Sequence, residues 1–421
     1  MLDINFIREN PDIIKKAANS KKIEVDIDKL LKLDDQRRDL LQKVENFRAE
    51  KNAANQNIAK LKGKEKEEAI KEMKSVSDDE KRLNEELKNI TEKFEYEMLF
   101  VPQPASKETP EGKDDTENKE LYTWGDIPKF DFDIKDHVEL GEKLDILDIP
   151  RGVKLAGTRS YFLKGDGALL EMATLKYTLD KLVSKGFTPF LVPHLVTDFA
   201  MTGTSYFPGG EEQAYRVEKD NVNLIGTSEV SVTAYHSGEI LKEEELPKKY
   251  TGYSPCYRRE AGTYGKDTHG LYRIHQFQKV EQVILCKNDP EESKKMHEML
   301  LKNAEEVLQD LKLPYRVVAV CTGDMGQGQY YKNDIETWMP SRDSYGETHS
   351  CSTFHEFQSR RLNMRYKDKD GKIHFCHTLN NTCIASPRIL IPILEIYQQK
   401  DGTVKIPEVL RPYMGGKTVI S

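Results

Sequence analysis

Two long stretches near the start of the chain carry mostly apolar residues in alternating steps of three and four. The first run occupies positions 30, 33, 37, 40, 44, 47, 51, 54, 58 and 61, and the second occupies positions 69, 73, 76, 80, 83, 87, 90 and 94. This heptad spacing predicts two helices that share a seam. Gly63 lies between the runs and favours a turn. We therefore predict an antiparallel helical hairpin whose arms, with roughly 35 residues each, extend about 50 Å.

The pattern changes after this hairpin, and the change predicts a second domain. Pro102 and Pro104 end the second helix, and the polar segment up to Glu120 has the composition of a linker. Shorter alternating runs then predict strands, with helices segregated between them, which indicates an α+β domain. The expected strands lie near 187–193, 214–225, 250–258, 272–286, 315–321, 346–353 and 373–380, and the expected helices near 169–185, 290–311 and 384–399. We therefore divide the chain into a helical domain at 1–100, a linker at 101–120 and an α+β domain at 121–421.

The charge pattern leaves two readings of the helical hairpin open. Charged residues make up 32% of the 421 residues and the net charge is −7, so any contact with nucleic acid must come from a local basic face. Such a set does occur on the first arm and the tip: Lys43, Arg48, Lys51, Lys60, Lys62, Lys64 and Lys66. Basic residues on a projecting arm can follow a phosphate backbone. The alternative is a coiled coil that serves oligomerisation and has a solvated charged face.

The six cysteines are scattered without a CxxC pair, which favours reduced thiols in a core. The cluster His374-Phe375-Cys376-His377 could be imagined as a zinc site, but its ligands are more crowded than those of structural zinc. We find no signal peptide and no apolar run long enough to cross a bilayer. These features predict a soluble protein of the reducing cytoplasm.

The stretch Pro255–Glu281 combines two predicted strands with several charged residues that suit phosphate chemistry. Its polar, glycine-rich centre predicts a long antiparallel hairpin. Arg258 and Arg273 lie near the loop, and the planar donors of arginine match phosphate oxygens. Glu260 and Glu281 could accept bonds from amino or hydroxyl groups. A hairpin with solvated charges remains the alternative, and the chain contains neither a P-loop nor a GxGxxG motif after a strand.

Several segments together resemble the motifs of one enzyme family. Residues 186–193 (GFTPFLVP) are similar to motif 1 of class II aminoacyl-tRNA synthetases, 254–262 (SPCYRREAG) with 273–281 (RIHQFQKVE) to motif 2, and 378–398 (TLNNTCIASPRILIPILEIYQ) to motif 3. Residues 226–229 (GTSE) occupy the place of the serine-binding TxE loop. Because these motifs occur in order behind a helical arm, the chain resembles the seryl-tRNA synthetases over essentially its whole length. The resemblance implies an antiparallel class II sheet flanked by helices, and a homodimer formed through motif 1.

The resemblance also implies a role for each matching residue. Arg258 and Arg388 would be catalytic, with Arg258 on the α-phosphate of ATP and on the serine carboxylate. Contacts to ATP are implied for Arg258, Arg259, Glu260, Arg273, Ile274, Phe277, Glu347, Thr348, His349, Ser350 and Arg388. Contacts to serine are implied for Thr227, Ser228, Glu229, Arg258, Glu281 and Thr382. Glu347 and Ser350 resemble the family's Mg²⁺ ligands, which are hard oxygen donors.

Within these sets, the family's pattern implies that adenine stacks between Phe277 and Arg388 and that Glu260 accepts a bond from its amino group. Glu281 and Thr382 would bond the serine hydroxyl, so alanine and glycine would leave buried polar groups unpaired. His269 departs from the pattern, because an arginine is common at this position of the motif 2 loop.

The implied function is ATP-dependent ligation of L-serine to tRNA(Ser) through a seryl-adenylate, with the selenocysteine tRNA left open as a second acceptor. Two rivals remain. One is a synthetase-like protein that activates an amino acid for another acceptor, such as a carrier protein, although such relatives tend to lack the arm. The other is a coiled-coil interaction protein with an inactive catalytic domain, against which the full set of site charges argues.

Overall fold

The computed structural model describes residues 1–262 and 269–421, apart from the side chains of residues 68–70, 72, 74, 75 and 78. Contacts between residues divide the chain into two compact units, Met1–Pro102 and Gln103–Ser421. The first unit contains four helices: α1 (Ile4–Glu9), α2 (Pro11–Ser20), α3 (Ile27–Ile58) and α4 (Lys64–Met98).

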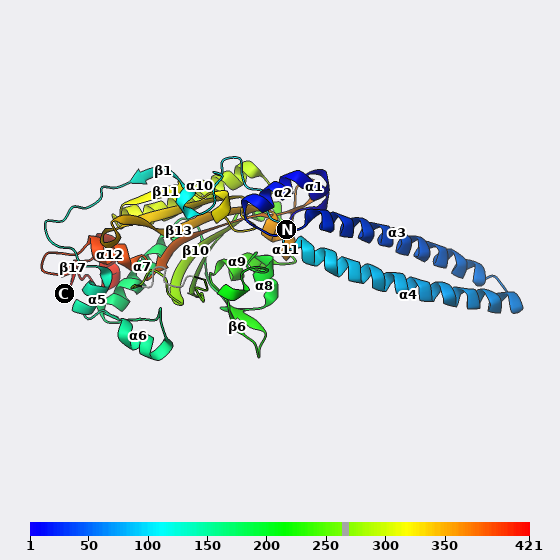
Figure 1. The fold of residues 1–421 in the computed structure, drawn as a ribbon, viewed down its shortest axis with the longest axis horizontal. Coiled ribbons are helices and arrows are strands. Elements are labelled where there is room, and N and C mark those ends of the chain that lie inside the picture. The colour runs from blue at the N-terminus through cyan, green and yellow to red at the C-terminus, as the bar shows by residue number, and fades with distance from the viewer. Residues whose placement is uncertain (263–268) are drawn as a thin grey trace. The chain divides into compact units, whose positions relative to one another are not determined.

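Helices α3 and α4 form the antiparallel hairpin that the heptad spacing predicts, with Gly63 (φ +64°) just before α4 (Figure 1). The side chain of Asp26 caps α3 by accepting a hydrogen bond from the Lys29 amide at 2.9 Å. The seam is partly polar: Lys51 Nζ lies 2.6 Å from Glu80 Oε2 on the opposite arm. Nearer the base, the Arg37 guanidinium packs 4.6 Å from the centre of the Phe94 ring. The predicted helical hairpin is therefore confirmed.

The second unit is built on an eight-stranded sheet with the order β1-β11-β12-β13-β16-β10-β9-β4. All neighbouring pairs are antiparallel except β4 and β9. The strands are β1 (Lys119–Trp124), β4 (Thr188–Leu191), β9 (Lys248–Tyr257), β10 (Gln276–Cys286), β11 (Tyr315–Ala319), β12 (Tyr331–Met339), β13 (Ser344–His355) and β16 (His377–Ser386). The predicted α+β class, with a mostly antiparallel sheet, is confirmed.

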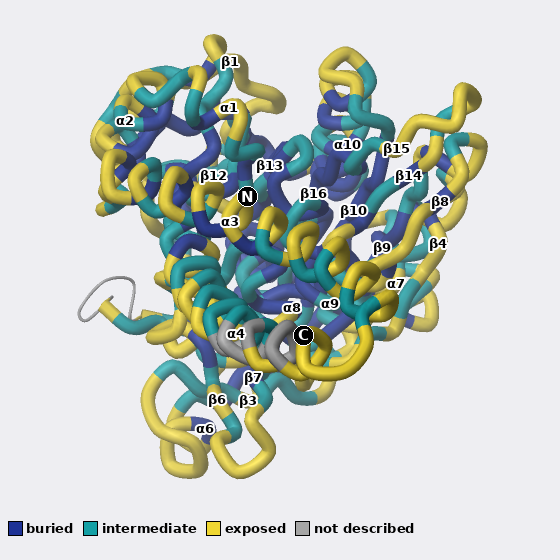
Figure 2. The backbone as a smooth tube through the Cα atoms, turned by 90° about the vertical axis from the view of Figure 1, so that its right-hand side faces the viewer, coloured by how far each residue is buried: buried dark blue, intermediate teal, exposed yellow. Residues whose placement is uncertain are grey.

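The long helices α7 (Asp166–Ser184) and α10 (Pro290–Asp310) pack on the central strands of this sheet. Alternate strand residues such as Val280, Ile284 and Cys383 join apolar side chains of both helices in the main core. Figure 2 shows the central strands as the most buried part of the backbone. Because strand side chains alternate between faces, the intervening residues of β10 and β16 point to the opposite face of the sheet, where the cavities described below lie.

Shorter elements surround the sheet. The remaining helices are α5 (His137–Lys143), α6 (Ile149–Ala156), α8 (Asp198–Gly203), α9 (Glu229–Thr233), α11 (Phe357–Leu362) and α12 (Leu390–Ile396). The remaining strands form small sheets: β2 (Leu147–Asp148), β3 (Phe162–Leu163), β5 (Leu195–Val196), β6 (Tyr215–Val217), β7 (Val222–Leu224), β8 (Ile240–Lys242), β14 (Arg365–Lys367), β15 (Ile373–Phe375), β17 (Val404–Lys405) and β18 (Val419–Ile420).

Four of the expected elements differ from those observed. The strand expected at 373–380 is interrupted at Cys376, and its two parts, β15 and the start of β16, lie in different sheets. The strand expected at 272–286 begins only at Gln276, because residues 269–275 form bends and turns at the base of the hairpin. The strand expected at 214–225 is two strands, β6 and β7, joined by a turn. The helix expected at 384–399 was wrong at its start: β16 continues to Ser386, and α12 spans only Leu390–Ile396. Pro387 lacks an amide hydrogen and separates the strand from the helix.

Candidate active site

The hairpin of β9 and β10 brings the predicted site residues to one face of the sheet. The two strands pair in register from Gln276 opposite Tyr257 to Leu285 opposite Lys248. On β10, Phe277 and Glu281 are an even number of residues apart and therefore share a face. The pairing of β10 with β16 contains an irregularity at which Glu281 faces Thr382. The two residues expected to read the serine hydroxyl are thereby brought together.

Two adjoining cavities lie on this face, and Arg258 lines both of them. The first is lined by ten of the predicted residues: Arg258, Glu260, Arg273, Ile274, Phe277, Glu347, Thr348, Ser350, Thr382 and Arg388. The second is lined by five of them: Glu229, Arg258, Glu281, Ser350 and Thr382.

Arg258 is held by neighbours that fix the direction of its guanidinium. Its Nε donates to the carbonyl of Gly226 in the TxE loop at 3.3 Å, and the guanidinium packs 5.3 Å from the centre of the Phe277 ring. Nearby, Arg273 Nη1 lies 3.2 Å from Glu260 Oε2. Glu260 has a φ of +52°, a left-handed conformation that is uncommon for a residue with a side chain. Such conformations cluster at functional sites.

Arg388, just before α12, bonds to two segments that line the first cavity. Its Nε donates to the Tyr272 carbonyl at 3.0 Å and its Nη1 to the Glu347 carbonyl at 2.9 Å. The guanidinium also packs 4.3 Å from the centre of the Tyr272 ring. Burial raises the pKa of the Glu347 carboxyl, but Arg388 and then the other nearby cations outweigh burial, so this pKa lies below its ordinary value.

The second cavity contains a buried carboxylate, Glu229 at the start of α9. Its Oε2 accepts from the Tyr206 hydroxyl at 2.9 Å and its Oε1 from Gln358 Nε2 at 2.9 Å. Burial raises the pKa of Glu229 above its ordinary value, and the charge of Glu281 acts in the same direction. Tyr206 and Gln358 thus orient an anion that faces the cavity. Neither Tyr206 nor Gln358 was predicted from the sequence, since the two residues come from distant segments.

Lys279 is a further residue that the sequence analysis missed. Its Nζ lies 2.6 Å from Glu281 Oε2, and both side chains are almost fully buried (5% and 3% exposed). The same Nζ donates to Thr382 Oγ1 at 3.3 Å, and that hydroxyl donates to Glu281 Oε2 at 3.1 Å. Lys279 therefore compensates the buried charge of Glu281. Its place between Phe277 and Glu281 in the strand's alternation was a signal that could have identified it.

The donors expected to bind Mg²⁺ lie beside a third oxygen-bearing residue. Asp334 on β12 is paired in register with Ser350, and its buried Oδ1 has no hydrogen-bond partner. Its Oδ2 lies 2.9 Å from Lys332 Nζ. Burial, opposed by Lys332 and reinforced by Glu347, raises the pKa of Asp334 to about 6. Carboxylate and hydroxyl oxygens from Glu347, Ser350 and Asp334 make a donor set that fits a hard cation such as Mg²⁺.

Four predicted residues do not line either cavity as the structure describes them. Arg259 is exposed, and its backbone amide donates to the Gln213 carbonyl. Ser228 is buried and donates to the Gly252 carbonyl, while Thr227 Oγ1 accepts from the Glu229 amide, so these two residues shape the TxE loop. His349 is buried and does not line the cavity, because in a strand it points to the opposite face from its neighbours Thr348 and Ser350, which do line it.

The residues of the imagined zinc site bond to separate partners. His374 Nε2 lies 2.8 Å from Asp368 Oδ2, and His377 Nδ1 lies 2.6 Å from Ser293 Oγ. Cys376 is buried and unpaired, as are the other five cysteines. Within the described part of the chain, no group of three or more His, Cys, Asp or Glu side chains could hold a metal ion, and no helix is long and apolar enough to span a membrane.

Comparisons with known proteins identify the class of this fold and site. Residues 215–397 match the model of the class II tRNA synthetase core domain (G, H, P, S and T). Residues 1–104 match the model of the seryl-tRNA synthetase N-terminal domain. The second unit is thus a class II aminoacyl-tRNA synthetase domain.

Full-length relatives identify the family within this class. The chain is 46% identical to the serine–tRNA ligase of Deinococcus radiodurans, covering 100% of this chain and 99% of the relative. It is 45% identical to that of Clostridium tetani, with 100% of both chains covered. The crystal structure of seryl-tRNA synthetase from Pyrococcus horikoshii complexed with ATP superimposes with a TM-score of 0.92 at 37% identity, over 100% of this chain and 99% of that one. The chain belongs to the seryl-tRNA synthetase family, whose members are ligases that join serine to tRNA.

Proposed function

We propose that the protein ligates serine to tRNA(Ser) in two steps at the paired cavities. An oxygen of the serine carboxylate first attacks the α-phosphorus of ATP, which forms seryl-adenylate and releases pyrophosphate. A ribose hydroxyl of the terminal adenosine of the tRNA then attacks the acyl carbon, which releases AMP. Both steps transfer a group between bound substrates, so catalysis comes from positioning and charge stabilisation. We keep the selenocysteine tRNA open as a second acceptor.

The position of Arg258 carries this proposal, because its side chain lines both cavities at once. A guanidinium at this junction can bond the α-phosphate on one side and the serine carboxylate on the other. It would then stabilise the negative charge that develops where the two reactants meet.

We assign the first cavity to ATP. The relative from P. horikoshii was crystallised with ATP, and one from Naegleria fowleri, 32% identical with a TM-score of 0.88, with AMP. Phe277 supplies an aromatic face for adenine, and Glu260 supplies an acceptor for its amino group. Arg273 and Arg388 supply cations for the γ-phosphate.

We assign the second cavity to serine. Glu229 would accept from the serine ammonium, and Glu281 with Thr382 would bond its hydroxyl. The Thr382 hydroxyl and Lys279 both donate to Glu281 Oε2. That arrangement directs Glu281 to act as an acceptor for a substrate that carries a hydroxyl. Alanine cannot supply this additional donor to the buried Glu281 carboxylate, which favours serine.

We infer that Mg²⁺ binds at Glu347 and Ser350, with the orphaned Oδ1 of Asp334 next to them. When bound, the ion would neutralise phosphate oxygens of ATP. The part played by the chain is to hold these oxygens on adjacent strands and to balance their charge through Lys332.

We assign tRNA binding to the helical unit and catalysis to the α+β unit, with the division at residues 101–120. Lys60, Lys62, Lys64 and Lys66 at the hairpin tip are exposed, whereas Lys51 is engaged with Glu80 in the seam. The tip is therefore the better candidate for phosphate contacts. Unpaired cysteines support a location in the reducing cytoplasm.

We also propose a homodimer formed through motif 1. Large apolar side chains are exposed on β4 and on α6 and α7: Leu191 (84%), Leu155 (77%) and Met172 (63%). Exposed apolar side chains of this size mark interaction surfaces where they form a patch. Sedimentation equilibrium at micromolar concentration distinguishes a dimer from a monomer.

Replacing Arg258 with alanine tests the proposed site. We expect serine-dependent exchange of pyrophosphate into ATP to fall by about 10²–10³-fold or more, since one donor to the developing charge is lost. The matched control is Arg216→Ala, which removes an exposed arginine that pairs with Asp198 at 2.9 Å. Exchange near the wild-type rate in Arg258→Ala would refute the role of this arginine.

A further inference from the structure

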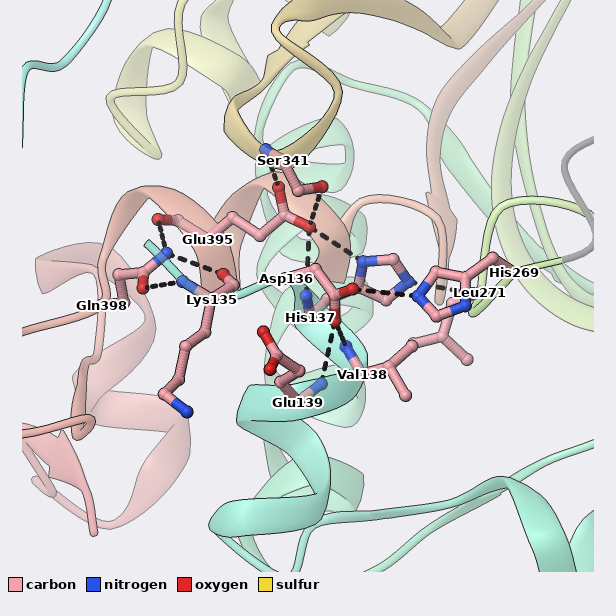
Figure 3. A network of polar contacts seen from close by, with 10 residues as sticks. All are labelled: Lys135, Asp136, His137, Val138, Glu139, His269, Leu271, Ser341, Glu395 and Gln398. Atoms are coloured by element: carbon pink, nitrogen blue, oxygen red, sulfur yellow. Dashed lines mark hydrogen bonds and ion pairs between the residues drawn. The ribbon is translucent and has the colours of Figure 1, made fainter. Parts of the chain in front are cut away.

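A buried carboxylate connects three segments that are distant in the sequence (Figure 3). Glu395 on α12 is completely buried. Its Oε2 accepts from the Ser341 amide at 2.9 Å, and its Oε1 accepts from the Ser341 hydroxyl at 2.8 Å. The same Oε1 accepts from the His137 amide at 3.1 Å and lies 2.8 Å from His137 Nδ1. Glu395 therefore ties motif 3 to the β12–β13 turn and to the start of α5.

The other ring nitrogen of His137 reaches the end of the motif 2 loop. His137 Nε2 accepts a hydrogen bond from the Leu271 amide at 3.2 Å. Because this partner is a donor, Nε2 must carry no proton, and Nδ1 is then the nitrogen that donates to Glu395. The imidazole is thus a neutral bridge that connects Glu395 to the backbone of Leu271.

The backbone at Gly270 fits closely against this ring. Gly270 has a φ of +69°, and a Cβ built there would lie 1.9 Å from His137 Nε2. The adjacent His269 contacts Asp136, with Nε2 3.0 Å from Oδ2. Two consecutive residues of the chain, Asp136 and His137, therefore hold three consecutive residues where the motif 2 loop ends.

The residues that follow directly form one wall of the first cavity. Leu271, Tyr272, Arg273 and Ile274 all line it. Two guanidinium groups pack on the Tyr272 ring, with Arg388 4.3 Å and Arg342 4.4 Å from the ring centre. Arg342 follows Ser341, which Glu395 holds. A shift of Leu271 would therefore displace both the cavity wall and the ring on which Arg388 packs.

We propose that His137 is a positioning residue for the nucleotide cavity, which couples the end of motif 2 to Glu395 of motif 3 without touching either substrate. This inference rests on the proposed function. His137 would keep Leu271–Ile274 in the arrangement that binds ATP. The serine cavity would depend on His137 much less, because neither Leu271 nor its neighbours are among the described residues that line it.

The substitution His137→Asn separates the two bonds of the ring. The amide nitrogen of asparagine can replace Nδ1 and keep the bond to Glu395, whereas nothing replaces Nε2 at Leu271. We expect the Kd of ATP by calorimetry and the KM of ATP in pyrophosphate exchange to rise about tenfold, the effect of one unsatisfied buried donor. The KM of serine should change less than twofold. An ATP Kd and KM within twofold of wild type would overturn the proposal.

His236→Asn is the matched control. His236 is also buried, with Nδ1 2.7 Å from a carboxylate oxygen of Glu239 and Nε2 2.8 Å from the Tyr250 hydroxyl, but it does not line the described cavities. It should lower the unfolding temperature without a selective effect on ATP. An equal ATP defect in this control would also contradict the proposal, because it would indicate a general structural effect.

If His137→Asn does not fold, Gly270→Ala provides the second test, since its Cβ would enter the space of His137 Nε2 with the ring intact. The same ATP-selective loss is expected, and unchanged ATP affinity would overturn the proposal. Wild-type protein without serine-dependent exchange would instead refute the proposed function, so the two failures are distinguishable.

Discussion

Charge balance around the serine cavity depends on a few side chains. Glu229 and Glu281 are two buried carboxylates that face one space, and the charge of Glu281 raises the pKa of Glu229 further. Lys279 is the buried cation that compensates them, at 2.6 Å from Glu281. Tyr206 and Gln358 donate to Glu229 and stabilise its charged form. The cavity is therefore poised to bind an ammonium group, which adds the positive charge that completes the balance.

This balance predicts how serine binding depends on pH. The pKa of Glu229 is raised by burial, so it takes up a proton at a higher pH than an exposed carboxyl would. Protonated Glu229 cannot pair with the serine ammonium, so the KM of serine should rise as the pH falls toward this raised pKa. It should be constant at higher pH, where Glu229 is ionised. Steady-state pyrophosphate exchange between pH 5.5 and 8 measures the effect.

The matched variant for this titration is Glu229→Gln, which keeps the shape but cannot ionise. Its KM for serine should be high and independent of pH across the same range, while its KM for ATP should stay near that of the wild type. A serine KM in the variant that still follows the wild-type pH profile would show that another group titrates.

The residues that could be predicted from sequence are those with motif spacing. Arg258, Glu260 and Phe277 lie within one hairpin, so their approach follows from strand pairing alone. Tyr206, Gln358 and His137 are held by partners 23, 129 and 258 residues away. Nothing in the local pattern around them indicates a partner at that distance, because only the folded topology brings these segments together.

Among the structural elements, the long helices follow most directly from the pattern of residues. The heptad spacing predicted α3 and α4, since these two helices pack mainly against each other along one seam. β12 was not predicted, because Tyr331–Met339 alternates charged residues such as Lys332 and Asp334 on a face that is buried at the site. The charged residues of β12 serve the cavity, so the strand lacks the usual alternation of apolar buried residues and polar solvated residues.

The hairpin gives a prediction that concerns tRNA alone. Changing the four tip lysines to glutamate should lower kcat/KM for tRNA by about tenfold or more. The slope of log kcat/KM against log salt concentration should become shallower by about 3, since four phosphate contacts are lost. Pyrophosphate exchange should be unaffected. Filter assays of charging at several salt concentrations measure this effect. The variant carries these four changes: Lys60→Glu, Lys62→Glu, Lys64→Glu and Lys66→Glu.

A second variant with the same change in net charge separates local from global electrostatics. It reverses four exposed lysines of the α+β unit: Lys119→Glu, Lys295→Glu, Lys367→Glu and Lys400→Glu. Charging by this variant should exceed that of the tip variant by about tenfold. Equal losses in the two variants would contradict a specific role for the hairpin tip and would favour a general effect of charge.

The two units of the whole molecule offer separate chemistries. The helical unit presents basic residues on a thin hairpin, and the α+β unit presents the paired cavities. The net charge of −7 disfavours unspecific binding of nucleic acid, so recognition must come from local surfaces. An enzyme that acylates a carrier protein would need the cavities but not the hairpin, and a pure interaction protein would need the hairpin but not the cavities.

The most direct test of the account is to charge total tRNA with each of the twenty labelled amino acids, using the full-length chain with ATP and Mg²⁺. We expect acid-precipitable label with serine and background with alanine, glycine and the other amino acids. Serine-dependent pyrophosphate exchange without label on tRNA would contradict the proposed acceptor. Label from a different amino acid would contradict the assignment of the second cavity.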